Sequence, residues 1–122
     1  MLSHVAVNVT DFEAAKRFYL AALKPLRYRV VYEEPDALAY FADRNGLDFG
    51  IGRRAPDGGA HVAFECADRG TVDVFYAAAL AAGGRDNGAP GVRPQYDASY
   101  YAAYVLDADG NNIEAVCHEP QS

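Results

Sequence analysis

The stretch HVAVNVTDFEAAKRFYLAAL, residues 4–23, returns in altered form as HVAFECADRGTVDVFYAAAL, residues 61–80. At an offset of 57 residues the two stretches are identical at nine of twenty positions, including the opening His-Val-Ala and an internal Phe-Tyr. A repeat of this length in 122 residues predicts one domain built from two copies of one unit. We expect unit one at residues 1–53, a linker at 54–59 and unit two at 60–118 of a single domain, 1–122.

Each copy is predicted to run strand, helix, strand, strand, strand. The openings alternate apolar and other residues with the period of a strand, and the Phe-Tyr segments follow with helical spacing. Thr10 with Glu13 fits a helix capping box, and Asp68 is the capping candidate in the second copy. Residues 84–94 are rich in Gly, Pro and Asn, which predicts only a short strand or loop there. The fold class is therefore α+β, with two tandem βαβββ units forming a curved mixed sheet around a cleft.

Composition excludes several classes of partner. The formal net charge is −6, whereas nucleic acids and anionic membrane surfaces are bound by basic faces. No apolar run approaches the ~20 residues of a membrane-spanning helix. The first residues also lack the pattern of a signal peptide, so we expect a cytoplasmic protein without nucleic-acid or membrane partners. Cys66 and Cys117 lack a CxxC spacing and are expected to be reduced core residues.

Two histidines and one glutamate share the predicted sheet face opposite the apolar side chains. Strand alternation places His4 and His61 at equivalent positions of the two units, and it places Glu114 on the same side of the last strand. A glutamate in an apolar strand is costly to bury without a partner. A divalent ion, Mn²⁺, Fe²⁺, Zn²⁺ or Ni²⁺, bound by His4, His61 and Glu114 would supply that partner. Taken singly, such residues are more often hydrogen-bonded or solvated, and the two-fold placement of the histidines favours the metal site.

The paired units, the HVAV and HVAF openings and the closing DADGNNIEAV resemble the vicinal oxygen chelate superfamily over nearly the whole chain. That superfamily includes glyoxalase I, extradiol dioxygenases, and fosfomycin- and bleomycin-resistance proteins. The resemblance implies metal ligands at His4, Gly50, His61 and Glu114, and three of these positions carry a ligating side chain. Glycine at 50 argues against the activity of classical glyoxalase I, because a resemblance to that enzyme implies carboxylates at both last-strand positions.

The substrate pocket is predicted to be aromatic. Tyr100 and Tyr104 share a strand face. A second alignment of the two units, at an offset of 64 residues, matches Tyr40 with Tyr104 and Gly50 with Glu114. Arg93 offers a cation at the rim, and Gly50 is expected to leave room on the open side of the metal. Tyrosines that only fill a strand explain the same pattern.

Two classes of function remain open from the sequence. One is a metal-dependent enzyme that acts on a small oxygenated substrate as a lyase, transferase or dioxygenase-like protein. The other is a metal-free protein of the bleomycin-resistance type that binds a small molecule. A homodimer is expected, because the resemblance implies that small chains of this superfamily pair their units between two subunits. His4 of one subunit would then face His61 and Glu114 of the other, and pairing of the two units within one chain is the alternative.

Overall fold

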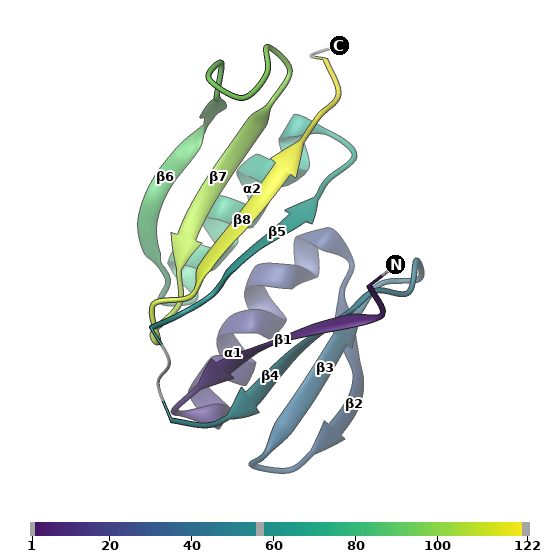
Figure 1. Ribbon diagram of the computed structural model, residues 1–122, viewed down its shortest axis with the longest axis vertical. Coiled ribbons are helices and arrows are strands. Elements are labelled where there is room, and N and C mark those ends of the chain that lie inside the picture. The colour runs from purple at the N-terminus through teal and green to yellow at the C-terminus, as the bar shows by residue number, and fades with distance from the viewer. Residues whose placement is uncertain (1, 56–57, 121–122) are drawn as a thin grey trace.

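The two predicted units are present in the computed structural model, which describes residues 2–55 and 58–120 (Figure 1). Unit one consists of β1 (His4–Val9), α1 (Phe12–Leu23), a short 3₁₀ helix (Lys24–Leu26), β2 (Arg29–Glu34), β3 (Leu38–Ala42) and β4 (Asp48–Arg53). Unit two consists of β5 (His61–Glu65), α2 (Arg69–Ala81), β6 (Arg85–Val92), β7 (Tyr101–Leu106) and β8 (Asn112–Cys117). The α+β class and the βαβββ order are confirmed.

Each unit has its own four-stranded mixed sheet. The strand orders are β1-β4-β3-β2 and β5-β8-β7-β6, and the first pair in each sheet is parallel. In unit one Ala6 pairs with Gly50, and in unit two Ala63 pairs with Glu114. Because Ala6 and Ala63 are equivalent in the repeat, Gly50 and Glu114 occupy the same place in the two sheets, as the sequence alignment predicted.

Two local predictions are wrong. Strand β6 is eight residues long, where a short strand or loop was expected. It is an edge strand with register shifts, and an edge position tolerates Pro90 and several glycines because the lost pairing costs little there. The cap of α1 is Asp11 rather than Thr10, since the Asp11 carboxylate accepts the Ala14 N–H at 3.1 Å. Asp68 caps α2 as predicted, through the Thr71 N–H at 2.7 Å.

One face of each sheet is covered by the helix of its unit, and the other face is open (Figure 1). The helices contact each other, and aromatic side chains join the units into one core. The ring of Phe64 in β5 lies 5.1 Å from that of Phe49 in β4 and 5.3 Å from that of Tyr28. Cys66 and Cys117 are free thiols in this core, and burial raises the pKa of the Cys66 thiol to about 12.

The turn between β7 and β8 is tied to unit one by buried polar groups. Both Asp107 and Asn111 are buried, and Asp107 accepts hydrogen bonds from the Tyr19 hydroxyl of α1 at 2.5 Å and from the Asn111 amide at 2.8 Å. Asn111 also donates to the Asn8 carbonyl at 3.1 Å and accepts from the Ala60 N–H at 2.8 Å. Because each of these groups is satisfied by a residue far away in sequence, the network fixes how the two units are oriented.

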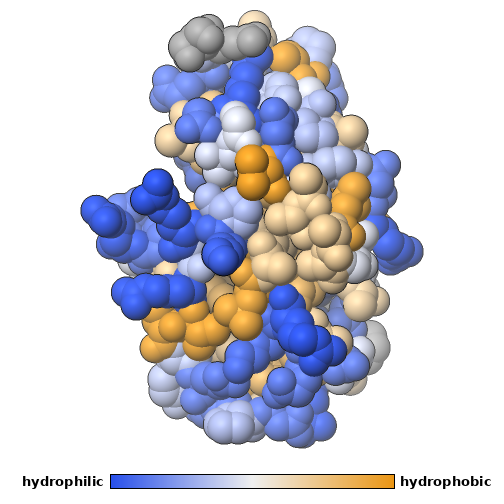
Figure 2. Space-filling model, turned by 180° about the vertical axis from the view of Figure 1, so that it is seen from behind, coloured by the Kyte–Doolittle hydropathy of each residue, from blue (hydrophilic) through white to orange (hydrophobic). Residues whose placement is uncertain are grey.

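The helix side of the molecule is hydrophilic toward both ends, with hydrophobic side chains gathered across the middle (Figure 2). On the helices Leu20 and Val74 remain exposed. Within the described residues, neither helix has the length and apolar character needed to cross a membrane.

Candidate functional site

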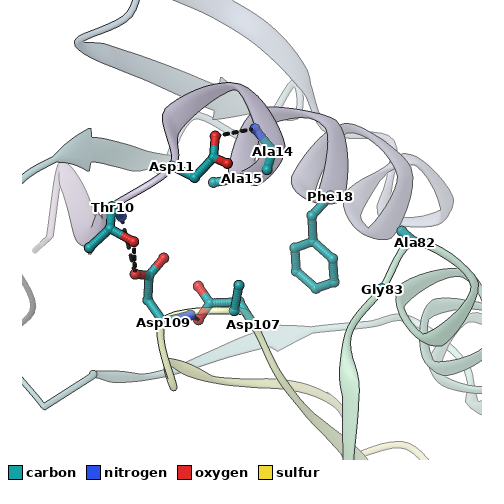
Figure 3. A pocket seen from close by; sticks show the side chains of 10 residues that line it. Thr10, Asp11, Ala14, Ala15, Phe18, Ala82, Gly83, Asp107 and Asp109 are labelled. Atoms are coloured by element: carbon teal, nitrogen blue, oxygen red, sulfur yellow. Dashed lines mark hydrogen bonds between the residues drawn. The ribbon is translucent and has the colours of Figure 1, made fainter.

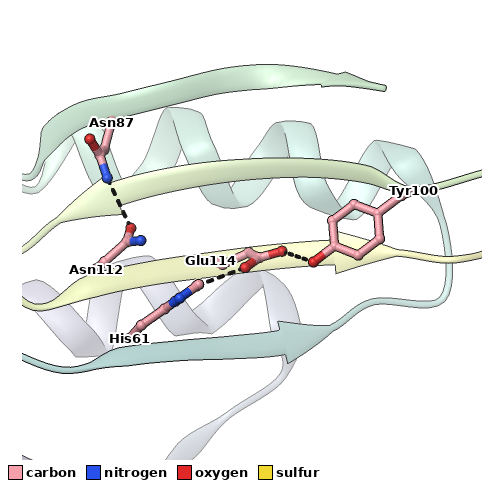
Figure 4. A network of polar contacts seen from close by, with 5 residues as sticks. All are labelled: His61, Asn87, Tyr100, Asn112 and Glu114. Carbon is pink, nitrogen blue, oxygen red and sulfur yellow. Dashed lines mark hydrogen bonds and ion pairs between the residues drawn. The ribbon is translucent and has the colours of Figure 1, made fainter. Parts of the chain in front are cut away.

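Glu114 lies at the centre of a polar cluster on the open face of unit two (Figure 4). It is only 2 % exposed, although the face carries no helix. One carboxylate oxygen, Oε1, is 2.8 Å from Nε2 of His61 in the neighbouring strand β5. The other, Oε2, accepts a hydrogen bond from the Tyr100 hydroxyl. The predicted pair of His61 and Glu114 is therefore in direct contact within one unit.

Tyr100 is the reason that the glutamate can be buried. A carboxylate removed from water is costly unless its oxygens are hydrogen-bonded, and here both are. Burial raises the pKa of the Tyr100 phenol strongly, and the hydrogen bond to Glu114 raises this pKa further. Tyr100 therefore keeps its proton at neutral pH and remains a hydrogen-bond donor. The His61 side chain stays 55 % exposed, which leaves the outer side of the cluster open to a ligand.

Aromatic side chains surround this cluster. Tyr104 pairs directly with Glu114 across β7 and β8, and its ring lies 6.3 Å from that of His61. The Tyr100 ring lies 5.0 Å from that of Tyr96 and 5.2 Å from that of His118. Tyr96 and His118 thus join Tyr100 and Tyr104 in an aromatic wall around the cluster on unit two.

The equivalent place in unit one holds His4 and Tyr40, whose rings are 5.6 Å apart. The Nδ1 atom of His4 is 2.8 Å from the Ser3 hydroxyl. In the described part of one chain, no three His, Cys, Asp or Glu side chains are grouped so that they could hold a metal ion. The structure therefore brings His61 and Glu114 together and leaves His4 outside their cluster.

The space expected beside Gly50 is filled by a tyrosine. Tyr40 pairs with Gly50 across β3 and β4, and a Cβ atom built on Gly50 would lie 2.5 Å from Cε1 of the Tyr40 ring. The space left by the missing side chain of Gly50 is therefore occupied by the Tyr40 ring and is not an open coordination position. Glutamate at position 50 could be accommodated only if that ring moved.

This contact leads to a prediction for Gly50→Ala. The added methyl group should displace the Tyr40 ring and lower the free energy of unfolding by about 1–3 kcal/mol, the usual cost of overpacking. In a Tyr40→Ala background the same change should cost much less. Urea unfolding of the two single variants and the double variant measures this coupling. Equal costs of Gly50→Ala in both backgrounds would contradict the packing described here.

A cavity of about 230 Å³ lies elsewhere in the molecule (Figure 3). Its ten lining residues come from the start of α1, the end of α2 and the β7–β8 turn. Asp109, at its edge, accepts hydrogen bonds from the hydroxyl and N–H of Thr10 at 2.8 and 3.1 Å, while Asp11 caps α1. These carboxylates already have structural partners, so the functional argument stays with the Glu114 cluster.

Comparison with known proteins shows the family of the chain. The model of the Glyoxalase/Bleomycin resistance protein/Dioxygenase superfamily matches residues 1–115. The chain belongs to this superfamily. A solved structure of a glyoxalase/bleomycin resistance protein from Albidiferax ferrireducens T118 is 31 % identical, with a TM-score of 0.85 over 96 % of this chain and 98 % of that one. Among curated proteins, no sequence matches this chain.

More distant members of the superfamily share the fold. Lactoylglutathione lyase from Agrobacterium tumefaciens is 19 % identical, with a TM-score of 0.73 over 96 % of this chain and 92 % of that chain. The fosfomycin resistance protein FosX from Mesorhizobium loti is 20 % identical, with a TM-score of 0.72 over 96 % and 91 %. Some members are thus enzymes, while the reaction differs from one member to another.

Sequence reasoning missed one hydrogen bond of the site and the buried network that joins the two units. Tyr100 was predicted as a pocket residue, but its hydrogen bond to Glu114 has no signal in the spacing of the two residues. The buried pair of Asp107 and Asn111 lies in a segment that was interpreted only as a turn. The available signal for this pair was in the sequence itself: two polar residues flank a turn between apolar strands, which could have indicated a buried hydrogen-bonded pair.

Proposed function

We propose that this chain is a metal-dependent enzyme of the vicinal oxygen chelate type that acts on a small oxygenated molecule as a homodimer. The observation that carries the proposal is the contact between His61 Nε2 and Glu114 Oε1 on an otherwise open sheet face. An imidazole nitrogen and a carboxylate oxygen are the donors that suit Mn²⁺, Fe²⁺, Ni²⁺ or Zn²⁺. The third ligand in the proposal is His4.

In the proposal a second subunit supplies the third ligand, because one chain brings only two of the three ligands together. His4 occupies the position of His61 in the repeat, but it belongs to the sheet of the other unit. If the open face of unit one in one subunit covers that of unit two in another, His4 approaches His61 and Glu114 of its partner. The two-fold symmetry of such a dimer would form two equal sites. An interface that closes both should bury well over ~1,000 Å².

The ion would act as a Lewis acid that polarises vicinal oxygens of the substrate. The chain's own residues perform the remaining tasks. The Tyr100 hydroxyl donates a hydrogen bond to Glu114 Oε2 and so fixes the orientation of that carboxylate, while the aromatic wall restricts access of water. The exposed edge of His61 faces the space in which the substrate would lie.

A metal-free binding protein is the second candidate, and one observation favours it. Both oxygens of Glu114 already have hydrogen-bond partners, so the buried carboxylate is satisfied without an ion. In that case the aromatic wall alone would bind the ligand. The cytoplasmic location expected from the sequence applies to both candidates and remains a prediction.

Metal content and subunit mass distinguish the two. Protein purified without chelators is expected to contain about one divalent ion per chain by elemental analysis, and to scatter light as a dimer at micromolar concentration. Chelation should remove the ion and lower the melting temperature, because an ion that binds only the folded protein stabilises it. A dimer without metal uptake would favour the binding protein, and a monomer would contradict the shared site.

A further inference from the structure

Arg93 places a cation on the open face next to the Glu114 cluster. It directly follows β6, and its N–H donates to the Tyr100 carbonyl at 2.7 Å across the base of the hairpin between β6 and β7. The Tyr100 side chain then reaches Glu114. The hairpin between β6 and β7 therefore positions both the Tyr100 hydroxyl that contacts Glu114 and the Arg93 side chain.

The Arg93 guanidinium lies against the sheet because two glycines make room for it. Its central carbon is 5.3 Å from the centre of the Tyr104 ring, within the range of a cation–π contact. A Cβ atom on Gly88 would lie 3.2 Å from Nη2, and one on Gly91 would lie 3.0 Å from Nη1. Side chains at these two positions would crowd the guanidinium, which is thus held flat over β6.

In the part of the chain that the structure describes, this guanidinium has no acidic partner. Its Nη2 donates a hydrogen bond to the Ala89 carbonyl at 2.7 Å, and the guanidinium also interacts with the Tyr104 hydroxyl. Within residues 2–55 and 58–120, no ion pair joins Arg93 to a carboxylate. Arginine has five N–H donors, so several remain for a ligand. In a chain with a net charge of −6, a half-buried cation without a counter-ion beside a candidate site is suited to an anion.

The spacing of the strands sets the size of that anion. Glu114, Tyr104 and Gly88 form one row across β8, β7 and β6. Neighbouring strands are about 4.8 Å apart, so the guanidinium over Gly88 lies roughly 10 Å along the sheet from Glu114. A ligand that reaches both places is a small molecule with its charged group a few bonds from its chelating oxygens.

We propose that the substrate is a small carboxylic acid whose carboxylate pairs with Arg93 while its vicinal oxygens face His61 and Glu114. This inference rests on the proposed function. A carboxylate matches the planar fork of a guanidinium, and its single charge is balanced by one arginine. A phosphate group would bring nearly two negative charges to a site with one such cation and a buried glutamate.

The test uses two chelating probes that differ in charge. Acetohydroxamate and succinic acid monohydroxamate both present vicinal oxygens, and only the second carries a carboxylate. Titration calorimetry on the metal-loaded dimer should show about 10- to 100-fold tighter binding of the second probe, as expected of a charge-assisted hydrogen bond. This preference should weaken at high salt.

Variants of Arg93 assign the preference to its side chain. Arg93→Gln should remove it and leave acetohydroxamate binding unchanged, while Arg93→Lys should retain part of it, because the charge remains without the fork. Arg17→Gln, on the exposed side of α1, is the matched control and should behave as wild type. Thermal unfolding verifies that each variant is folded. Equal affinity of the two probes for the wild type, or a preference that persists in Arg93→Gln, overturns the inference.

Failure of the proposed function gives a different result. If the protein takes up no metal, neither hydroxamate has an ion to chelate. In that case the binding of benzoate and of benzamide to the metal-free protein is compared, with tyrosine fluorescence as the signal. Tighter binding of benzoate that is lost in Arg93→Gln supports the anion site. The absence of any such preference overturns it.

Discussion

Replacing Glu114 with glutamine is expected to lower the affinity of the protein for Mn²⁺ or Zn²⁺ by more than about 100-fold. Loss of a group that only orients a metal ligand typically costs 10- to 100-fold, and loss of a charged ligand itself should cost more. The amide has nearly the shape of the carboxylate, and its oxygen still accepts a hydrogen bond, so the fold should persist. Equilibrium dialysis with elemental analysis measures the affinity.

Glu13→Gln is the matched control for this change. Glu13 is exposed on α1, which lies on the covered side of its sheet, and the control should bind metal as the wild type does. His61→Ala and His4→Ala should each weaken binding as well. If the ligands come from different subunits, exchange of subunits in an equal mixture of the two variants should restore about one quarter of the sites, because about half of the dimers are then mixed and each mixed dimer has one intact site. Unchanged metal uptake by folded Glu114→Gln protein would remove Glu114 from the site.

Asn111→Ala is expected to lower the free energy of unfolding by about 2–4 kcal/mol. The change removes the acceptor of the Ala60 N–H, one donor to the Asn8 carbonyl and one of the donors to buried Asp107. Loss of a partner by a buried polar group costs about 1–3 kcal/mol, and here buried Asp107 loses one donor while the hydrogen bonds to Ala60 and Asn8 are lost as well. Urea unfolding at one fixed protein concentration measures the effect, since a dimer's stability depends on concentration.

Asn87→Ala provides the comparison for this variant. Asn87 is exposed and makes a side-chain hydrogen bond to Asn112 at 3.2 Å, so its loss should change the free energy of unfolding by less than about 0.5 kcal/mol. An Asn111→Ala protein as stable as Asn87→Ala would show that the Asp107 network contributes nothing to the joining of the two units.

The repeat in the sequence was sufficient for the order of the elements and for the register of the key strands. Strand alternation and helical spacing are local properties, so they can be interpreted without knowledge of the neighbours. The equivalence of Gly50 with Glu114, and of Tyr40 with Tyr104, followed from the two offsets and is confirmed by the pairing of β4 and β8 with their neighbours. Strand β6 was missed because its edge position, rather than its composition, permits it to pair.

By itself, the sequence determined the two-unit fold and named His61 and Glu114 as residues of one sheet face. Only the tertiary structure decided their partners. The Tyr100 hydroxyl reaches Glu114 because a hairpin turns back at Arg93, and the Tyr40 ring covers Gly50 because the strands between them pair in that register. Such contacts depend on the three-dimensional path of the chain and on which sheet face each side chain occupies. The spacing of residues along the sequence shows the periodicity of a helix or strand and therefore predicts these elements. Side-chain contacts between different elements form only when the sheets assemble.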